Sequence, residues 1–170
     1  MAIERPSWQM KMTVPLELGI STIHMSRMVN FYTEVLGLRL VADNEVTAEM
    51  SRRTGATSEG YRIVRLQTPY GERIKLVQAG SPPKQADSPA YVFGRQGFAY
   101  LTFVIADLDG MIKRPKDYKV KLLSNGEKVE VRPGVFAIYA IDPEGNSIEL
   151  VECPDVASYR PDLYKWRQFF

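Results

Sequence analysis

A ten-residue segment occurs twice in this chain, and this repeat constrains the fold more than any other feature. PYGERIKLVQ begins at Pro69, and PEGNSIELVE begins 74 positions later, at Pro143. The Pro, Gly, Ile, Leu and Val residues of the two copies match in register. A turn followed by an apolar strand, repeated once, predicts two similar modules that pack together, with equivalent residues facing one shared cavity. Lys75 and Glu149 are one such equivalent pair.

The composition indicates one globular domain and excludes several classes of partner. The 170 residues suffice for one hydrophobic core. The 22 Lys and Arg residues nearly balance the 20 Asp and Glu residues and are scattered, so we expect no nucleic acid and no membrane as a partner. The sequence has no run of 18 apolar residues and no signal-peptide pattern, which makes the cytoplasm the expected location. A single cysteine and a single histidine exclude an internal disulfide and a Cys/His zinc site.

The first half of the chain predicts the order βαβββ. Residues 16–23 alternate between apolar and polar side chains, as in a half-buried strand. Ser26 is the predicted N-cap of a helix that ends at Gly37. This helix carries an apolar stripe at helical spacing, formed by Met28, Phe31, Tyr32, Val35 and Leu36. Further strands are expected at residues 38–46, 61–68 and 73–78, and a polar connection that could hold a helical turn at 47–60.

The second half repeats this order after a proline-containing linker. Asp107 follows a strand and starts a short helix, which Pro115 stops. The strands of this half are expected at residues 98–106, 119–123, 129–131, 135–141 and 147–152. We therefore divide the chain into an N-terminal arm (1–14), a first module (15–78), a linker (79–97), a second module (98–152) and an aromatic tail (153–170).

Three strings together resemble one known family. They are FYTEVLG at residues 31–37, YLTFVIADLD at 100–109 and DPEGNSIELV at 142–151. In this order they are similar to the vicinal oxygen chelate superfamily, which includes glyoxalase I, extradiol dioxygenases and bleomycin-resistance proteins. The resemblance covers roughly residues 16–152 and implies an α+β fold, in which two paired βαβββ modules form curved sheets around an open cavity. It does not imply a reaction.

The resemblance also implies four positions for metal ligands, on the first and fourth strands of each half. In this sequence they are Glu17, Lys75, Tyr100 and Glu149. A lysine ammonium has no lone pair and repels a cation, and a phenol with a pKa of about 10 is a poor ligand at neutral pH. The sole histidine, His24, lies at a strand-to-helix corner and is interpreted as an exposed or capping residue. We therefore predict that the metal site is lost and that the protein has no cofactor.

Strand alternation predicts that these four side chains face away from the helices. In a structural interpretation, Lys75 neutralises Glu17 and Glu149 in a buried ion-pair cluster. In a functional interpretation, Lys75 anchors a carboxylate or stabilises an oxyanion, Tyr100 donates a hydrogen bond, and one of the two glutamates takes a proton from carbon. Arginines at 62, 65 and 132 could add an anion anchor or could form a solvated outer face.

Three functions remain open on this pattern. The first is a metal-independent isomerase, epimerase or lyase that acts beside a carbonyl, with Glu17, Lys75, Tyr100 and Glu149 as the catalytic residues. The second is a ligand-sequestering protein of the bleomycin-resistance type, without chemistry. The third is a metal-dependent lyase or dioxygenase with displaced ligands. An enzyme is favoured, and its expected partner is a small molecule that is anionic or aromatic.

The aromatic tail predicts an interface. Residues 159–170 contain five aromatic side chains with little charge to keep them in water. Exposed aromatic patches mark protein contacts. We therefore expect a homodimer, with a lid over the chain's own cavity as the alternative.

Overall fold

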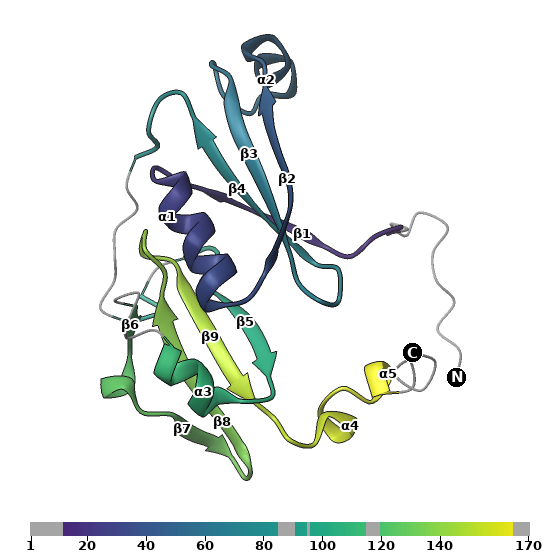
Figure 1. The fold of residues 1–170 in the computed structure, drawn as a ribbon, viewed down its shortest axis with the longest axis vertical. Helices are drawn as coiled ribbons and strands as arrows, with labels where there is room; N and C mark the ends of the chain where they lie inside the picture. Colours follow the sequence, from purple (N-terminus) through teal and green to yellow (C-terminus); the bar gives the residue numbers. More distant parts are fainter. Residues whose placement is uncertain (1–11, 85–90, 95, 115–119, 165–170) are drawn as a thin grey trace.

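Two separate sheets, each with one helix packed on a face, form the molecule (Figure 1). The computed structural model describes residues 12–84, 91–94, 96–114 and 120–164. The sheets do not close into a barrel, and the α+β class with two βαβββ modules is confirmed. Residues 1–11 of the predicted arm, residues 85–90 and 95 of the linker, Pro115 and residues 165–170 of the tail lie outside the described residues.

The N-terminal sheet has the strand order β1-β4-β3-β2. In this sheet β1 runs parallel to β4, and the other neighbours are antiparallel. Its strands are β1 (Glu17–Ser21), β2 (Arg39–Val46), β3 (Tyr61–Gln67) and β4 (Arg73–Ala79). The helix α2 (Ala48–Thr54) fills the connection in which a helical turn was expected.

The C-terminal sheet repeats this arrangement with the order β5-β9-β8-β6, and β7 also pairs with β8, so that β6 and β7 together take the place that β2 has in the first sheet. Its strands are β5 (Tyr100–Ile105), β6 (Lys121–Leu122), β7 (Val129–Arg132), β8 (Val135–Ile141) and β9 (Ser147–Glu152). Strands β3 and β8 begin 74 positions apart, and so do β4 and β9. The internal repeat therefore extends over a complete hairpin.

The remaining helices are short. Helix α3 (Leu108–Lys113) begins after Asp107, whose side chain accepts from the Gly110 N–H at 2.8 Å, as the sequence predicts. The others are the single turn η3 (Ser124–Gly126), α4 (Val156–Tyr159) and α5 (Pro161–Tyr164). No helix in the described part of the chain is both long and apolar enough to cross a membrane.

One hydrophobic core joins the two halves. Helix α1 (Met25–Asn30) continues as a π-helical segment, η1 (Phe31–Val35). Four residues of the predicted apolar stripe, Met28, Phe31, Tyr32 and Val35, are buried, and Leu36 is half-buried against the same core. The same cluster contains residues of both sheets: Val64, Leu66, Ile74, Leu76, Ile138, Ala140, Ile148 and Leu150. In Figure 1, α1 lies at the junction of the two sheets.

The predicted N-cap at Ser26 is wrong. Helix α1 begins at Met25, and His24 occupies the N-cap position without a capping side-chain hydrogen bond. The acceptor comes instead from the β8–β9 turn of the other half. Glu144 accepts from the backbone N–H groups of Ile23 at 3.0 Å and His24 at 2.6 Å, and from the Thr22 hydroxyl at 2.7 Å. A carboxylate satisfies otherwise unpaired N–H groups at a helix N-terminus and favours their positive end.

Asp142 fixes the turn that presents Glu144. Its carboxylate accepts from the backbone N–H groups of Glu144 at 2.9 Å and Asn146 at 2.8 Å. It also accepts from the hydroxyl of Tyr32 in η1, at 3.1 Å. Burial raises the pKa of Tyr32 well above its usual value, and the charge and hydrogen bond of Asp142 raise it further. Tyr32 therefore stays protonated and acts as a permanent donor to Asp142.

Replacing Glu144 with Ala should destabilise the protein by about 2 kcal/mol, because three donors lose a charged acceptor. Urea unfolding at neutral pH measures this change. The control is Glu127→Ala, which removes an exposed carboxylate that makes no hydrogen bond or ion pair with the described residues. Equal stability of the two variants would mean that Glu144 does not hold the halves together.

Candidate functional site

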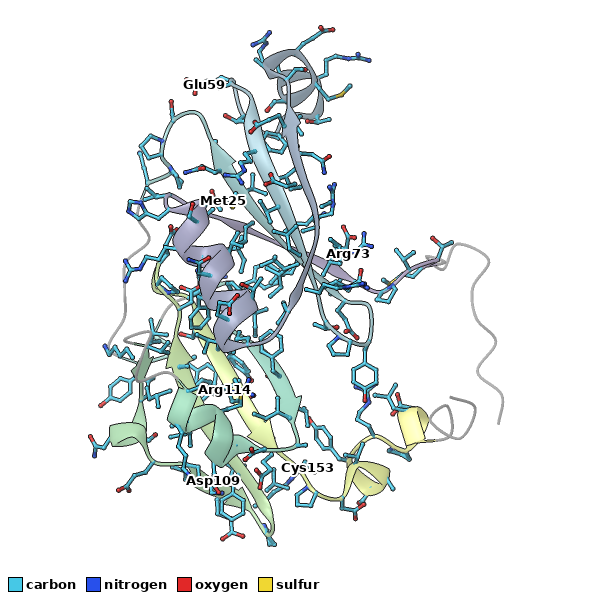
Figure 2. The ribbon with its side chains drawn as sticks, viewed as in Figure 1. Met25, Glu59, Arg73, Asp109, Arg114 and Cys153 are labelled. Carbon is cyan, nitrogen blue, oxygen red and sulfur yellow. The ribbon has the colours of Figure 1, made fainter. Side chains whose placement is uncertain are left out.

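The N-terminal sheet has one face against α1 and one open face. On β4, Ile74 and Leu76 are buried in the core, so Arg73 and Lys75 point to the opposite side. Glu17 of β1 shares this open face, because it is the register partner of Arg73. Figure 2 shows Arg73 near the crossing of β1 and β4, away from Met25 on α1.

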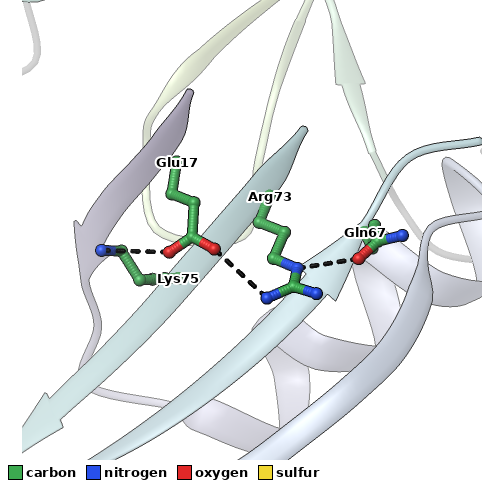
Figure 3. Close-up of polar contacts among 4 residues, drawn as sticks. All are labelled: Glu17, Gln67, Arg73 and Lys75. Carbon is green, nitrogen blue, oxygen red and sulfur yellow. Dashed lines mark hydrogen bonds and ion pairs between the residues drawn. The ribbon is translucent and has the colours of Figure 1, made fainter. Parts of the chain in front are cut away.

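Glu17 lies between two cations (Figure 3). Its Oε2 is 3.4 Å from Lys75 Nζ, and its Oε1 is 3.3 Å from Arg73 Nη1. Arg73 Nε also donates to Gln67 Oε1 at 2.7 Å. The side chains of Glu17, Lys75 and Arg73 are 25%, 31% and 37% exposed. The predicted contact between Glu17 and Lys75 is present, but the pair is only half-buried.

The equivalent face of the C-terminal sheet holds Glu149 in a hydrogen-bonded group. Glu149 accepts from the Thr102 hydroxyl at 2.7 Å and from the Tyr139 hydroxyl at 3.1 Å. The Tyr139 ring lies edge to face against the ring of Tyr100, with centroids 5.5 Å apart. Burial raises the pKa of Tyr139 to about 12, with further contributions from Glu149 and Tyr100. Tyr139 therefore stays protonated and donates to Glu149.

The four predicted site residues thus form two groups, one on each sheet. Lys75 and Glu149 make no ion pair within the described part of the chain, so the expectation of one buried cluster around Lys75 is wrong. Tyr100 and Glu149 are linked through Tyr139. The sequence pattern did not identify Tyr139, Thr102 and Arg73 as members of these groups. Tyr139 could have been predicted from the sequence, because it alternates with the apolar residues Ile138 and Ala140 and so lies on the opposite face of the strand from them.

A cavity of about 530 Å³ lies between β1 and the start of β5, and we call it the junction cavity. Gly19, the register partner of Lys75, lines it from the N-terminal sheet. Tyr100 lines it from the C-terminal sheet. Glu17, Lys75 and Glu149 are not in its wall. The cavity therefore borders both groups through their neighbours, and His24 and Glu144 line it as well.

The sequence matches one family model, that of the glyoxalase/bleomycin resistance protein/dioxygenase superfamily, over residues 15–150. The chain belongs to this superfamily. A glyoxalase family protein from Bacillus cereus is 26% identical, with a TM-score of 0.73 over 86% of this chain and 98% of that one. The trypanothione-dependent glyoxalase I of Leishmania major is 18% identical, with a TM-score of 0.61 over 91% and 97% of the two chains. A comparison with curated proteins found no match.

The donor set in this member of the superfamily does not suit a divalent metal. Each oxygen of Glu17 already faces a cation, and each oxygen of Glu149 already accepts a hydrogen bond. Among the described residues, no three His, Cys, Asp or Glu side chains gather in a way that could hold an ion. Lys75 adds a positive charge where a ligand would be required. The absence of a cofactor stays a prediction, which these contacts favour.

The pKa of Tyr139 is about 12, so this residue should ionise later than an ordinary tyrosine, whose pKa is about 10. Because the folded-state pKa is the higher one, its contribution to stability is present below about pH 10 and is lost as the pH rises through about 12. An alkaline titration followed by tyrosine NMR signals should show one late step, which Tyr139→Phe removes. Glu149→Gln should lower that pKa part of the way, whereas Glu127→Gln should not change it. A Tyr139 that titrates with the ordinary tyrosines would contradict the contact with Glu149.

Proposed function

We propose that this protein is a small-molecule enzyme that transfers a proton at a carbon beside a carbonyl group, without a resident metal. One observation carries the proposal. A carboxylate held by two hydroxyls stands on one sheet, a group of cations stands on the other, and the junction cavity lies between the two sheets. A base and an electrostatic stabiliser are the two groups that enolisation requires.

Glu149 is the better candidate for the base. Both oxygens of Glu17 are engaged with cations, whereas the partners of Glu149 are neutral hydroxyls that can turn away. The C–H bond breaks, its proton goes to the Glu149 carboxylate, and the electron pair moves into the carbonyl to form an enolate oxygen. Tyr100, which lines the junction cavity, donates a hydrogen bond to this oxygen, and the cations on the N-terminal sheet attract its negative charge from across the cavity. Return of the proton to the other face or to the neighbouring carbon gives an epimer or an isomer, and loss of a leaving group gives a lyase reaction.

A row of aromatic rings favours a second candidate function. Phe93 lies against Tyr100 with centroids 5.7 Å apart, and Tyr100 lies against Tyr139. Such a row offers ring faces and edges to a flat aromatic ligand. A protein of the bleomycin-resistance type would use this row to bind and sequester an aromatic compound without chemistry.

Proton transfer can be measured without knowing the natural substrate. In D₂O, the protein should exchange the α-hydrogens of at least one member of a panel of 2-oxo acids and acyl thioesters for deuterium. The loss of the corresponding proton NMR signals measures the rate of exchange. Glu149→Gln should slow this exchange by about 100-fold or more, because it removes the base. Chelating agents should leave the rate unchanged, and dialysed protein should contain no stoichiometric transition metal.

The matched control for this experiment is Glu45→Gln, which changes an exposed carboxylate on β2. An exchange rate that requires added metal would contradict the metal-independent mechanism. Tight binding of aromatic compounds by a protein that exchanges none of the panel would favour sequestration.

We also propose that the protein is a homodimer, with the tail as part of the interface. The guanidinium carbon of Arg132 lies 5.0 Å from the centre of the Tyr159 ring, which fixes the start of the tail on its own chain. Tyr159 and Leu163 are still 38% exposed. Apolar side chains left partly uncovered on short helices support a contact with a second copy.

Truncation after Pro154 should convert the dimer into a less soluble monomer, because it removes α4, α5 and the last aromatic residues. Sedimentation of the full-length and truncated proteins measures the change. A truncated protein that stays dimeric but loses ligand-induced thermal stabilisation would identify the tail as a lid. No change in either property would contradict both roles.

A further inference from the structure

Two cations face each other directly on the open face of the N-terminal sheet. Arg65 of β3 is the register partner of Lys75 of β4, and in an antiparallel pair such partners point to the same side. Arg73 lies two positions before Lys75 on the same face. Within strands β1, β3 and β4, Glu17 is the one carboxylate on this face. Like charges placed opposite each other destabilise a sheet, so this arrangement costs stability in the free protein.

Arg65 contributes an uncompensated charge to this group. Glu17 contacts Lys75 and Arg73, whereas Arg65 makes no hydrogen bond or ion pair with any other described residue. Arg62, three positions earlier on the same strand, points to the other face and binds both oxygens of Asp43, at 2.9 and 2.7 Å. The strand therefore has one arginine neutralised by Asp43 and one, Arg65, without a counter-charge in the part of the chain that the structure describes.

The fold itself does not require two cations at these positions. The residues 74 positions further on are Tyr139 and Glu149, which are also direct register partners. There the pair is a donor and an acceptor joined by a 3.1 Å hydrogen bond. The second module thus shows that the same place in the sheet holds a complementary pair, and the first module departs from it.

We propose that Arg65, Lys75 and Arg73 bind a doubly negative oxyanion group, a phosphate monoester or a dicarboxylate, at one end of a small-molecule ligand. Three cations and one carboxylate leave an excess of two positive charges, which a dianion matches. The flat guanidinium groups are suited to paired oxygens. Apart from Gly19 itself and its two chain neighbours, no heavy atom of the described residues lies within 4 Å of the position that a Cβ of Gly19 would occupy, so the face beside Lys75 is open. Gly19 also lines the junction cavity, which leaves room for the rest of the ligand.

This inference rests on the proposed small-molecule function, since it names the class of molecule that the site takes, but it requires no catalysis. Inorganic phosphate and malonate are the probes. Arg65→Gln should weaken the binding of at least one probe about tenfold or more, measured by calorimetry, because it removes a charged hydrogen-bond donor. The same variant without a probe should be as stable as the wild type or more stable in urea, because a repulsion is removed. Added sodium chloride should stabilise the wild type more than the variant.

The control is Arg62→Gln, which removes an arginine of the same strand from the opposite face. It should lower stability through the loss of the Asp43 pair and leave probe binding unchanged. Tighter binding of phosphate would indicate a phosphate monoester as the ligand group, and tighter binding of malonate would indicate a dicarboxylate. If neither probe binds, or if both bind Arg65→Gln as tightly as the wild type, the proposal is wrong. Probe binding that survives in Glu149→Gln while hydrogen exchange is lost separates this site from the proton-transfer step.

Discussion

The polar contact between the two halves depends on one turn, in which Glu144 caps helix α1 and Asp142 binds both the turn and Tyr32. The hydrogen bonds within each sheet stay inside one half, so this turn and the shared apolar core carry the connection between halves. The connection is not reciprocal. The residue equivalent to Glu144 is Tyr70, and α3 is capped within its own half by Asp107, while the Glu152 carboxylate accepts from the Leu108 N–H. The duplicated modules therefore share a fold, but α1 is capped by the other half whereas α3 is capped by its own half.

This asymmetry also shapes the site. Glu144 lines the junction cavity while it holds the N-terminus of α1, so the wall of the cavity and the end of the helix share one carboxylate. A ligand that donates to Glu144 would compete with the backbone of Ile23 and His24. The binding of such a ligand would thus be coupled to the contact that joins the halves, and its affinity and the global stability should respond together to changes at Glu144.

The sequence was sufficient for features that depend on local pattern and on the repeat. Alternation along β1 and β4 predicted that Glu17 and Lys75 share a face, and the 74-residue offset predicted the equivalence of β4 and β9. It was insufficient where distant segments meet. Ser26 had the local signal of an N-cap, but the capping group comes from 120 positions away. The separation of Lys75 from Glu149 follows from how the two sheets are set against each other, and no local pattern contains that information.

The equivalent positions of the two modules carry side chains of different charge, and this difference would favour one orientation of a bound ligand. Arg65 and Lys75 make the open face of the N-terminal sheet positive, whereas Tyr139 and Glu149 make the equivalent face a hydrogen-bonded carboxylate. A symmetric pair of modules would offer two similar half-sites and would bind a ligand in either orientation. With cations on one side and a carboxylate on the other, an anionic ligand is repelled from one half and attracted to the other, so one orientation is favoured. In the proposed mechanism, a fixed orientation would bring the same carbon of each ligand molecule to Glu149, as proton transfer at a defined position requires.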